Sequence, residues 1–191
     1  QIPDKLLPQT PENDPTSKEP IVKIRDLNSI YIEAGDTFSV EYQKGLYVDI
    51  FPFIDYPTVP RPWAKKLCKG ISVSYSILHA QHYYSLRSFA EFFYFGMKYA
   101  LFKGIWAMLC LVRPKGTYLS NILINNGYGI MHRKDSVFPL STITFEGKDF
   151  PAPGNVDAYL KDLYKNYMDI PPKEKQIVHA CYIHPELKPL P

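Results

Sequence analysis

Three patterns in the sequence predict a mixed α/β (α+β) fold. Near the start, short segments alternate apolar and polar residues with the period of two that is typical of strands. The middle holds two long helical segments, the second of which begins at a serine and ends at a proline. Near the end, an alternating segment turns back on itself and precedes a capped helix. We therefore expect a partial sheet, a central helical section and a C-terminal β-hairpin plus helix.

The composition is that of one soluble globular domain. The 191 residues are enough to bury a core, and 46% hydrophobic with 21% charged residues is an ordinary balance. The three cysteines lie far apart and form no CxxC pair, so neither a zinc knuckle nor a disulfide framework is indicated. Such sparse cysteines fit a reducing compartment, and we expect a cytoplasmic protein.

The first third of the chain reads as an irregular segment followed by strands. Residues 1–20 hold five prolines and predict an irregular lead-in. Residues 21–27 (IVKIRDL) and 29–34 (SIYIEA) predict strands, and 37–45 a connection or short strand. Residues 46–54 (LYVDIFPFI) form the clearest strand pattern, which Pro52 stops.

The middle of the chain predicts a turn-rich linker and two helices. Residues 55–62 (DYPTVPRP) form the linker, and 63–85 are largely helical. Residues 85–114 predict a long helix, capped by Ser85 or Ser88 and ended by Pro114. Its longest charge-free stretch, 104–112, is shorter than the about 20 residues of a membrane span. A central core helix is the favoured interpretation, and an interfacial membrane contact is the alternative.

The last third predicts a turn, a hairpin, a helix and a tail. We expect a glycine-rich turn at residues 116–129 and a β-hairpin over 138–154, with its turn at residues 146–148. Residues 155–168 have helical spacing behind an Asn155 cap. Residues 171–191 are expected to be loop and tail.

The charge is distributed unevenly along the chain. Residues 56–134 hold eleven basic residues and one acid, a net charge of +10, which leaves −7 for the rest of a chain of net +3. Two interpretations stay open: this basic section meets an anionic partner, such as a phosphate-bearing substrate or an anionic membrane, or the charges neutralise one another in the fold. We expect no nucleic-acid partner, because the aromatic residues crowd a helix instead of interleaving on strands.

Asp49 is the most informative candidate for chemistry. It stands among Tyr47, Val48, Ile50 and Phe51, and a buried carboxylate is costly unless a cation meets it. It can therefore be a strand carboxylate aimed into a cleft or a solvent-facing residue on a half-exposed strand, and the pattern alone favours the second. For Asp55, a backbone hydrogen bond in a turn is the first expectation and a metal ligand the second. No GxSxG, P-loop or GxGxxG motif occurs.

Four separated segments together resemble the LicD family, the phosphotransferases related to fukutin. They cover most of the chain and are residues 23–29 (KIRDLNS), 47–55 (YVDIFPFID), 138–164 (FPLSTITFEGKDFPAPGNVDAYLKDLY) and 167–172 (YMDIPP). The resemblance implies a nucleotidyltransferase-like sheet and Mg²⁺ or Mn²⁺ chemistry. It also implies transfer of phosphocholine, or a similar phospho-substituent, from a CDP-linked donor. The acceptor would be a glycan or lipid-linked sugar of the lipopolysaccharide or teichoic acid type.

The resemblance also assigns expected roles to residues. Asp49 matches the family's later strand carboxylate and would be catalytic and a metal ligand, and Asp55 matches a second acid of the same motif. Arg25 matches an R–D element and would contact substrate. Lys115, Arg133 and Lys134 are expected phosphate contacts because of their charge and their nearness to loops. Glu146 and Gly147 match the hairpin motif, and packing roles are expected for Tyr159, Leu160 and Tyr164.

The sequence departs from the family pattern in two places. Lys165 stands where the family has glycine after Tyr164. The acidic cluster of the form W-D-D-D-x-D is absent from the sequence and would lie before Gln1. We therefore expect residues 1–191 to be a single LicD-like domain without its N-terminal acidic segment, at the inner face of the membrane or free in the cytoplasm. The alternative is a non-catalytic nucleotide- or glycan-binding fragment or a degenerate family member.

Overall fold

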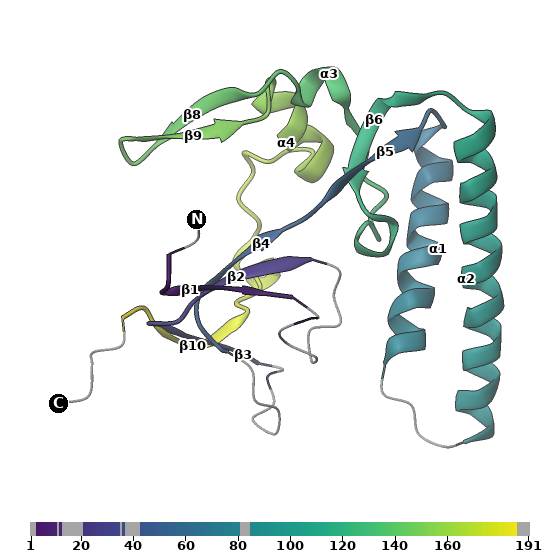
Figure 1. The fold of residues 1–191 in the computed structure, drawn as a ribbon, viewed down its shortest axis with the longest axis horizontal. Coiled ribbons are helices and arrows are strands. Elements are labelled where there is room, and N and C mark those ends of the chain that lie inside the picture. The colour runs from purple at the N-terminus through teal and green to yellow at the C-terminus, as the bar shows by residue number, and fades with distance from the viewer. Residues whose placement is uncertain are drawn as a thin grey trace. The chain divides into compact units, whose positions relative to one another are not determined.

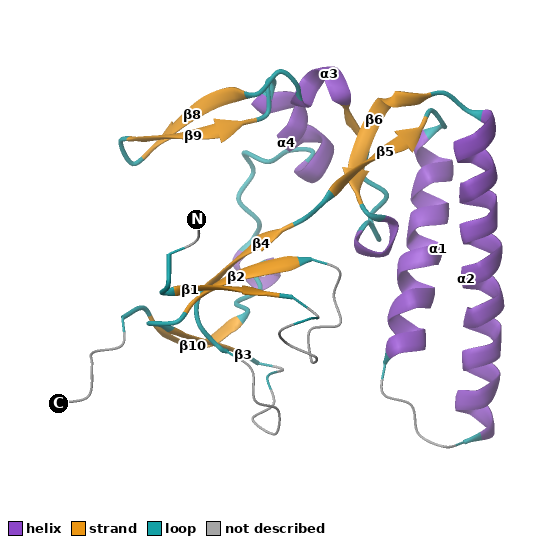
Figure 2. Cartoon of the chain, viewed as in Figure 1, coloured by secondary structure: helices purple, strands orange, loops and turns teal. Residues whose placement is uncertain are grey.

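The computed structural model describes residues 3–10, 12, 21–34, 36, 43–80 and 85–186 (Figure 1). They form helices and antiparallel sheets, which confirms the predicted α+β class (Figure 2). The chain divides into two compact units: a terminal unit of Gln1–Pro52 with Ile170–Pro191, and a central unit of Phe53–Asp169. The single LicD-like domain and the nucleotidyltransferase-like sheet stay predictions.

The terminal unit contains a three-stranded antiparallel sheet in the order β1–β2–β4. Its strands are β1 (Leu6–Gln9), β2 (Val22–Asp26) and β4 (Tyr47–Ile50). β2 confirms the first predicted strand. The prediction of an irregular lead-in is wrong at β1, whose residues pair with β2 from Leu6 opposite Asp26 to Gln9 opposite Lys23. β1 is an edge strand, where a proline such as Pro8 is tolerated.

A second pair of strands joins distant parts of the chain within the terminal unit. β3 (Ile30–Glu33) confirms the strand predicted at 29–34, and it pairs with β10 (Ala180–His184). The prediction of loop and tail for 171–191 is therefore wrong at β10, which is too short to read as a strand without its partner. A 3₁₀ turn, Lys173–Lys175, precedes it. Of the segment predicted as a connection, residues 37–42 lie outside the described residues.

The stretch YVDIFPFID contributes to both units. β4 ends at Ile50, and β5 (Phe53–Pro57) begins after Pro52. Proline has no amide hydrogen to continue a ladder, which explains the break that the sequence predicts there. The linker expected at 55–62 is wrong at both ends, because residues 55–57 complete β5 and residues 61–62 begin the next helix.

β5 belongs to the sheet of the central unit, whose order is β5–β6–β7. Its partners are β6 (Lys115–Asn121) and the short β7 (His132–Arg133). The glycine-rich turn expected at 116–129 is wrong at residues 116–121, which belong to β6 and pair with β5 and β7. A 3₁₀ turn, Leu123–Asn125, follows it.

Two helices, α1 (Arg61–His79) and α2 (Leu86–Val112), run side by side beside this sheet (Figure 1). They confirm the two helical predictions, except that residues 81–84 lie outside the described residues. The hydroxyl of Ser85 accepts a hydrogen bond from the Ser88 amide at 3.1 Å, so the predicted cap is confirmed. The helices approach closely at Gly70, where an added Cβ would lie 1.9 Å from the Phe102 ring.

The core of the central unit surrounds Tyr56 of β5, which is fully buried. Its ring meets Trp106 of α2 edge to face at 4.8 Å. Its hydroxyl donates to the Asn121 carbonyl at 2.7 Å and accepts from the Asn126 amide at 2.9 Å. Burial raises the pKa of this hydroxyl, so it stays protonated and keeps both bonds.

The prediction of a core helix at 85–114 holds for one face of α2 and is wrong for the other. Trp106 and Leu109 are buried on the side that packs against α1 and β5. The opposite side carries large apolar residues that stay exposed, among them Phe93 at 61% and Leu111 at 87%. α2 is apolar on both sides, which explains why its pattern resembles that of a core helix.

The remaining elements of the central unit confirm the C-terminal predictions. After α3 (Lys134–Val137), β8 (Ser141–Phe145) and β9 (Lys148–Ala152) form the expected hairpin. Its two turn residues, Glu146 and Gly147, both have positive φ, as tight hairpin turns require. α4 (Val156–Tyr164) follows, and the Asn155 side chain accepts from the Ala158 amide at 3.0 Å, as a cap does.

Candidate functional site

Asp49 lies on β4, at an edge of the terminal unit's larger sheet. The register of the sheet places it opposite Lys23 of β2, and Nζ of Lys23 lies 3.9 Å from Oδ1 of Asp49. The Asp49 side chain is 31% exposed, so it reaches solvent on one side and a cation on the other. This long, half-exposed pair is weak, because water and salt screen it. The carboxylate is therefore accessible to a ligand.

Arg25 and Tyr47 form the next cross-strand pair on the same face of these two strands. Arg25 is buried: its Nε donates to Oε1 of Gln9 at 2.6 Å and its Nη1 to the Gly45 carbonyl at 3.0 Å. Its guanidinium also lies 4.7 Å from the Tyr47 ring centroid. These contacts give Arg25 a role in holding the sheet together, and its role as a substrate contact stays a prediction.

Tyr47 stands between two cations and one acid. Nζ of Lys23 lies 4.4 Å from its ring centroid, and its hydroxyl donates to Oε1 of Glu33 at 2.9 Å. Burial, and then the hydrogen bond to Glu33, raise the pKa of the tyrosine hydroxyl. The surroundings of Asp49 on this face are thus polar: Lys23, Glu33 and Tyr47 are partly exposed, and Arg25 is buried.

The other candidates lie in the central unit. Nζ of Lys134 donates to Oδ1 of Asp55 at 3.1 Å, which joins an expected metal ligand to an expected phosphate contact. Arg133 donates through Nε to Oδ1 of Asp135 at 3.0 Å and through Nη2 to the other carboxylate oxygen. This hydrogen bonding lowers the pKa of Asp135 and raises that of Arg133. To contact a phosphate, Lys134 and Arg133 would each have to release its carboxylate partner.

Lys115 differs from these two cations. It lies at the start of β6 and is exposed. No carboxylate in the described part of the chain lies within ion-pair distance of it. Of the three expected phosphate contacts in the central unit, Lys115 therefore has the charge most available to an anion.

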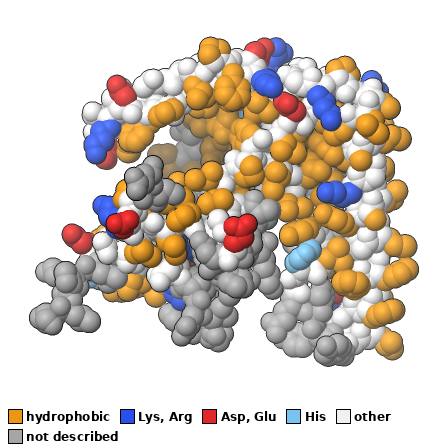
Figure 3. Space-filling view, in the orientation of Figure 1, with side chains coloured by type: hydrophobic (Ala, Val, Ile, Leu, Met, Phe, Trp, Pro, Cys, Tyr) orange, Lys and Arg blue, Asp and Glu red, His pale blue; other side chains and the backbone are white. Residues whose placement is uncertain are grey.

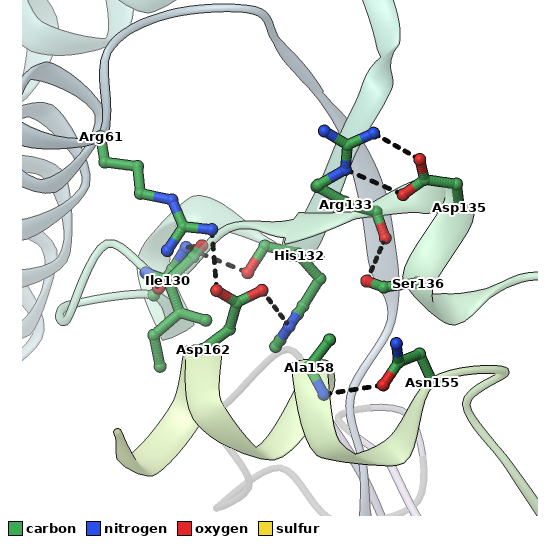
Figure 4. A network of polar contacts seen from close by, with 11 residues as sticks. Arg61, Ile130, His132, Arg133, Asp135, Ser136, Asn155, Ala158 and Asp162 are labelled. Atoms are coloured by element: carbon green, nitrogen blue, oxygen red, sulfur yellow. Dashed lines mark hydrogen bonds and ion pairs between the residues drawn. The ribbon is translucent and has the colours of Figure 1, made fainter. Parts of the chain in front are cut away.

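The structure adds a cluster that the sequence does not predict: His132, Asp162 and Arg61 (Figure 4). His132 of β7 is almost fully buried, stacked on Tyr159 of α4 at 4.2 Å between ring centroids. Its Nδ1 lies 3.5 Å from Oδ2 of Asp162 and makes no shorter hydrogen bond. Nη2 of Arg61, at the start of α1, donates to Oδ1 of the same carboxylate at 2.7 Å.

The electrostatics of this cluster favour a neutral imidazole. Burial lowers the pKa of His132, and the nearby Asp162 carboxylate opposes that effect only in part. One signal in the sequence could have indicated the cluster. Asp162 stands three residues after Tyr159, and residues at that spacing share a helix face. The stacking of Tyr159 on His132 confirms the packing role expected for Tyr159. Tyr164, by contrast, is exposed.

The described residues alone do not complete the metal site that the resemblance implies. No three His, Cys, Asp or Glu side chains within that part of the chain gather where they could hold a metal ion. Asp49 and Asp55 belong to different units, and each is paired with a lysine. A single carboxylate holds Mg²⁺ poorly, because that ion prefers several oxygen ligands.

Comparison with known proteins finds no match: no protein-family model, curated protein or solved structure resembles the chain significantly. The arguments for a function therefore come from the residues and their geometry, together with the resemblance of the four sequence segments to the LicD family.

Proposed function

We propose that this chain belongs to a transferase that moves phosphocholine, or a similar phospho-substituent, from a CDP-linked donor to a sugar of a cell-surface glycan. The observation that carries the proposal is the surroundings of Asp49. This carboxylate lies in an otherwise apolar strand, is 31% exposed, and has a weak partner at 3.9 Å. An acid kept accessible beside Lys23 is free to exchange that partner for a ligand of the reaction.

The chain's own residues suit the binding of a negatively charged donor. Lys115 is exposed and has no acid partner among the described residues, so it can meet phosphate oxygens directly. Lys134 and Arg133 can do so after releasing Asp55 and Asp135. Such cations stabilise the charge that develops on a leaving nucleoside monophosphate. We assign no step to a metal ion, although the resemblance implies one.

An assay of CMP release tests this proposal. The protein is incubated with CDP-choline, CDP-glycerol or CDP-ribitol and with a lipopolysaccharide or teichoic acid acceptor, whose sugar hydroxyl takes up the phospho-substituent. Each mixture contains Mg²⁺, Mn²⁺ or a chelator. We expect CMP release that needs the divalent ion, and a loss of about a hundredfold or more in Asp49→Asn. Asp149→Asn is the matched control, since Asp149 is an exposed strand carboxylate of the hairpin bonded to Thr144. Equal losses in both variants would contradict a special role for Asp49.

A binding module without catalysis is the second candidate. It is favoured by the absence, among the described residues, of three metal-ligating side chains in one place. Titration calorimetry with CDP separates the two candidates. CDP binding that is independent of divalent ions, with no CMP release from any donor, supports the binding module, and the absence of both binding and release removes both candidates.

A further inference from the structure

The exposed side of α2 forms one continuous apolar stripe. We call it the outer stripe; its large residues are Phe89, Phe93, Met97, Leu101, Met108 and Leu111. At 100° per residue they fall within an arc of about 120°, and they follow one side of the helix for roughly 33 Å. Small residues, including Gly104, fill the same arc, so no charge interrupts it.

The outer stripe is a true surface of the central unit, because α1 packs on the opposite side of α2 (Figure 1). Only 11% of the most apolar part of α2 is buried, although the helix is long and apolar enough to cross a membrane. Figure 3 shows hydrophobic side chains along the outer edge of α2. An apolar surface of this extent on a soluble protein marks an interaction site.

The charges of α2 lie beside the stripe, and they are mostly positive. Lys98 and Lys103 project from opposite sides, each about 100° to 120° from the centre of the stripe. The ammonium group of Lys98 lies 5.6 Å from the Phe95 ring centroid, and that of Lys103 lies 5.8 Å from that of Tyr99. The acid of this helix, Glu91, is already paired with Arg87 at 2.9 Å.

From these observations we infer that α2 lies in the plane of an anionic lipid bilayer, with its outer stripe among the acyl chains. The two lysines then reach the phosphate groups of the lipids, while their aliphatic stems and the aromatic rings beside them stay at the boundary. This inference does not depend on the transferase proposal.

An in-plane position fits the charges better than a spanning one. A spanning α2 would place Lys98, the thirteenth of its 27 residues, near the middle of the bilayer, where a charge is costly. α1 would have to enter with it, together with its exposed Lys65, Lys66 and Lys69. In the plane, all five lysines stay at or above the level of the head groups.

A second copy of the chain fits the stripe less well than a bilayer does. Two stripes stacked antiparallel about their midpoints would leave Lys98 and Lys103 of both copies along the edges of the interface. No described carboxylate lies within ion-pair distance of either lysine, so no described group of the second copy would neutralise these charges. Anionic lipid supplies the missing negative charge.

Sedimentation of the full chain with lipid vesicles tests the inference. We expect it to sediment with vesicles of phosphatidylcholine and phosphatidylglycerol, more weakly with phosphatidylcholine alone, and to be released in part by high salt. Phe93→Ser should weaken binding about tenfold, because the exposed ring no longer enters the acyl region. Lys98→Gln and Lys103→Gln should each weaken it up to about fivefold on anionic vesicles only.

Matched controls come from the β8–β9 hairpin. Phe145 is 65% exposed, close to the 61% of Phe93, so Phe145→Ser removes the same side chain from another surface and should leave binding unchanged. Lys148→Gln is the matched control for Lys98→Gln and Lys103→Gln, and it should also leave binding unchanged. Circular dichroism of every variant confirms the fold, which these exposed positions should not alter.

Three results would overturn the inference. The first is a failure to sediment with either type of vesicle. The second is a dimer in solution that Phe93→Ser dissociates, which would assign the stripe to a second copy. The third is a vesicle-bound fraction that resists both high salt and alkaline carbonate, which would make α2 a spanning helix.

Discussion

Asp49 and Asp162 are two carboxylates among apolar neighbours, one in each unit, and their surroundings differ. Asp162 is 15% exposed, accepts a hydrogen bond of 2.7 Å from Arg61 and lies 3.5 Å from the buried ring of His132. Asp49 is 31% exposed, and its ion pair with Lys23 is 3.9 Å long. The first acid is held firmly by groups that the fold brings to it, and the second is held loosely by its neighbour in the sheet.

The difference shows which acid can serve a ligand. Asp162 binds Arg61, which lies 101 positions away in the sequence, so replacing its partners would disturb the contact of α4 with β7 and α1. Asp49 can exchange Lys23 for another cation at little cost to the sheet. We therefore propose that Asp162 serves stability and Asp49 serves function. The following changes test this proposal, in order of their expected effect on stability.

Removing the firmly held acid should have the largest effect. In Asp162→Ala, Arg61 loses its carboxylate and His132 loses the acceptor nearest its Nδ1. We expect the free energy of unfolding to fall by about 1–2 kcal/mol, measured by denaturant titration, since Arg61 is exposed and can rehydrate. Asp157→Ala is the control on the same helix. Its carboxylate pairs with Lys161 at the surface, so a loss as large as that of Asp162→Ala would contradict the division.

The pH dependence of stability should reveal the buried imidazole. Burial lowers the pKa of His132 in the folded state, so as the pH falls the imidazole of the unfolded chain becomes protonated at a higher pH than that of the folded chain. Stability is then fully present above the unfolded pKa, about 6.5, and falls as the pH drops below it, by at most about 1.4 kcal/mol per pH unit. Denaturant midpoints between pH 7 and 5 measure this slope. His132→Gln should flatten it, and an unchanged slope would exclude His132 as its source.

The parts of the fold that could be predicted from the sequence are those with local causes. The hairpin at 138–154 needs positive φ at Glu146 and Gly147, and glycine supplies one of these positions readily. Asn155 begins α4 through a bond to an amide three residues on, and Ser85 does the same for α2. Pro52 interrupts the strand pattern after β4 because its ring leaves the backbone nitrogen without a hydrogen to donate. Each of these signals lies within a few residues of its effect.

The parts that were missed depend on distant partners. β10 is a strand because β3, about 150 residues earlier, pairs with it. The His132–Asp162 cluster forms when α4 packs on β7, and neither residue has a polar neighbour in sequence that predicts the other. For α2 the sequence favoured a core helix and left an interfacial membrane contact as the alternative. Hydropathy reports how apolar a residue is, and the same pattern describes a surface covered by protein and one left exposed.

The loosely held acid should contribute least to stability. Lys23→Gln and Asp49→Asn are combined in a double-mutant cycle, and denaturant titration of the four proteins gives the coupling between the two side chains. We expect less than about 1 kcal/mol, because the pair is long and half exposed. A coupling well above that value would make Asp49 a structural acid like Asp162. Its position in an apolar strand would then be explained by Lys23 alone, and the main support for the transferase proposal would be lost.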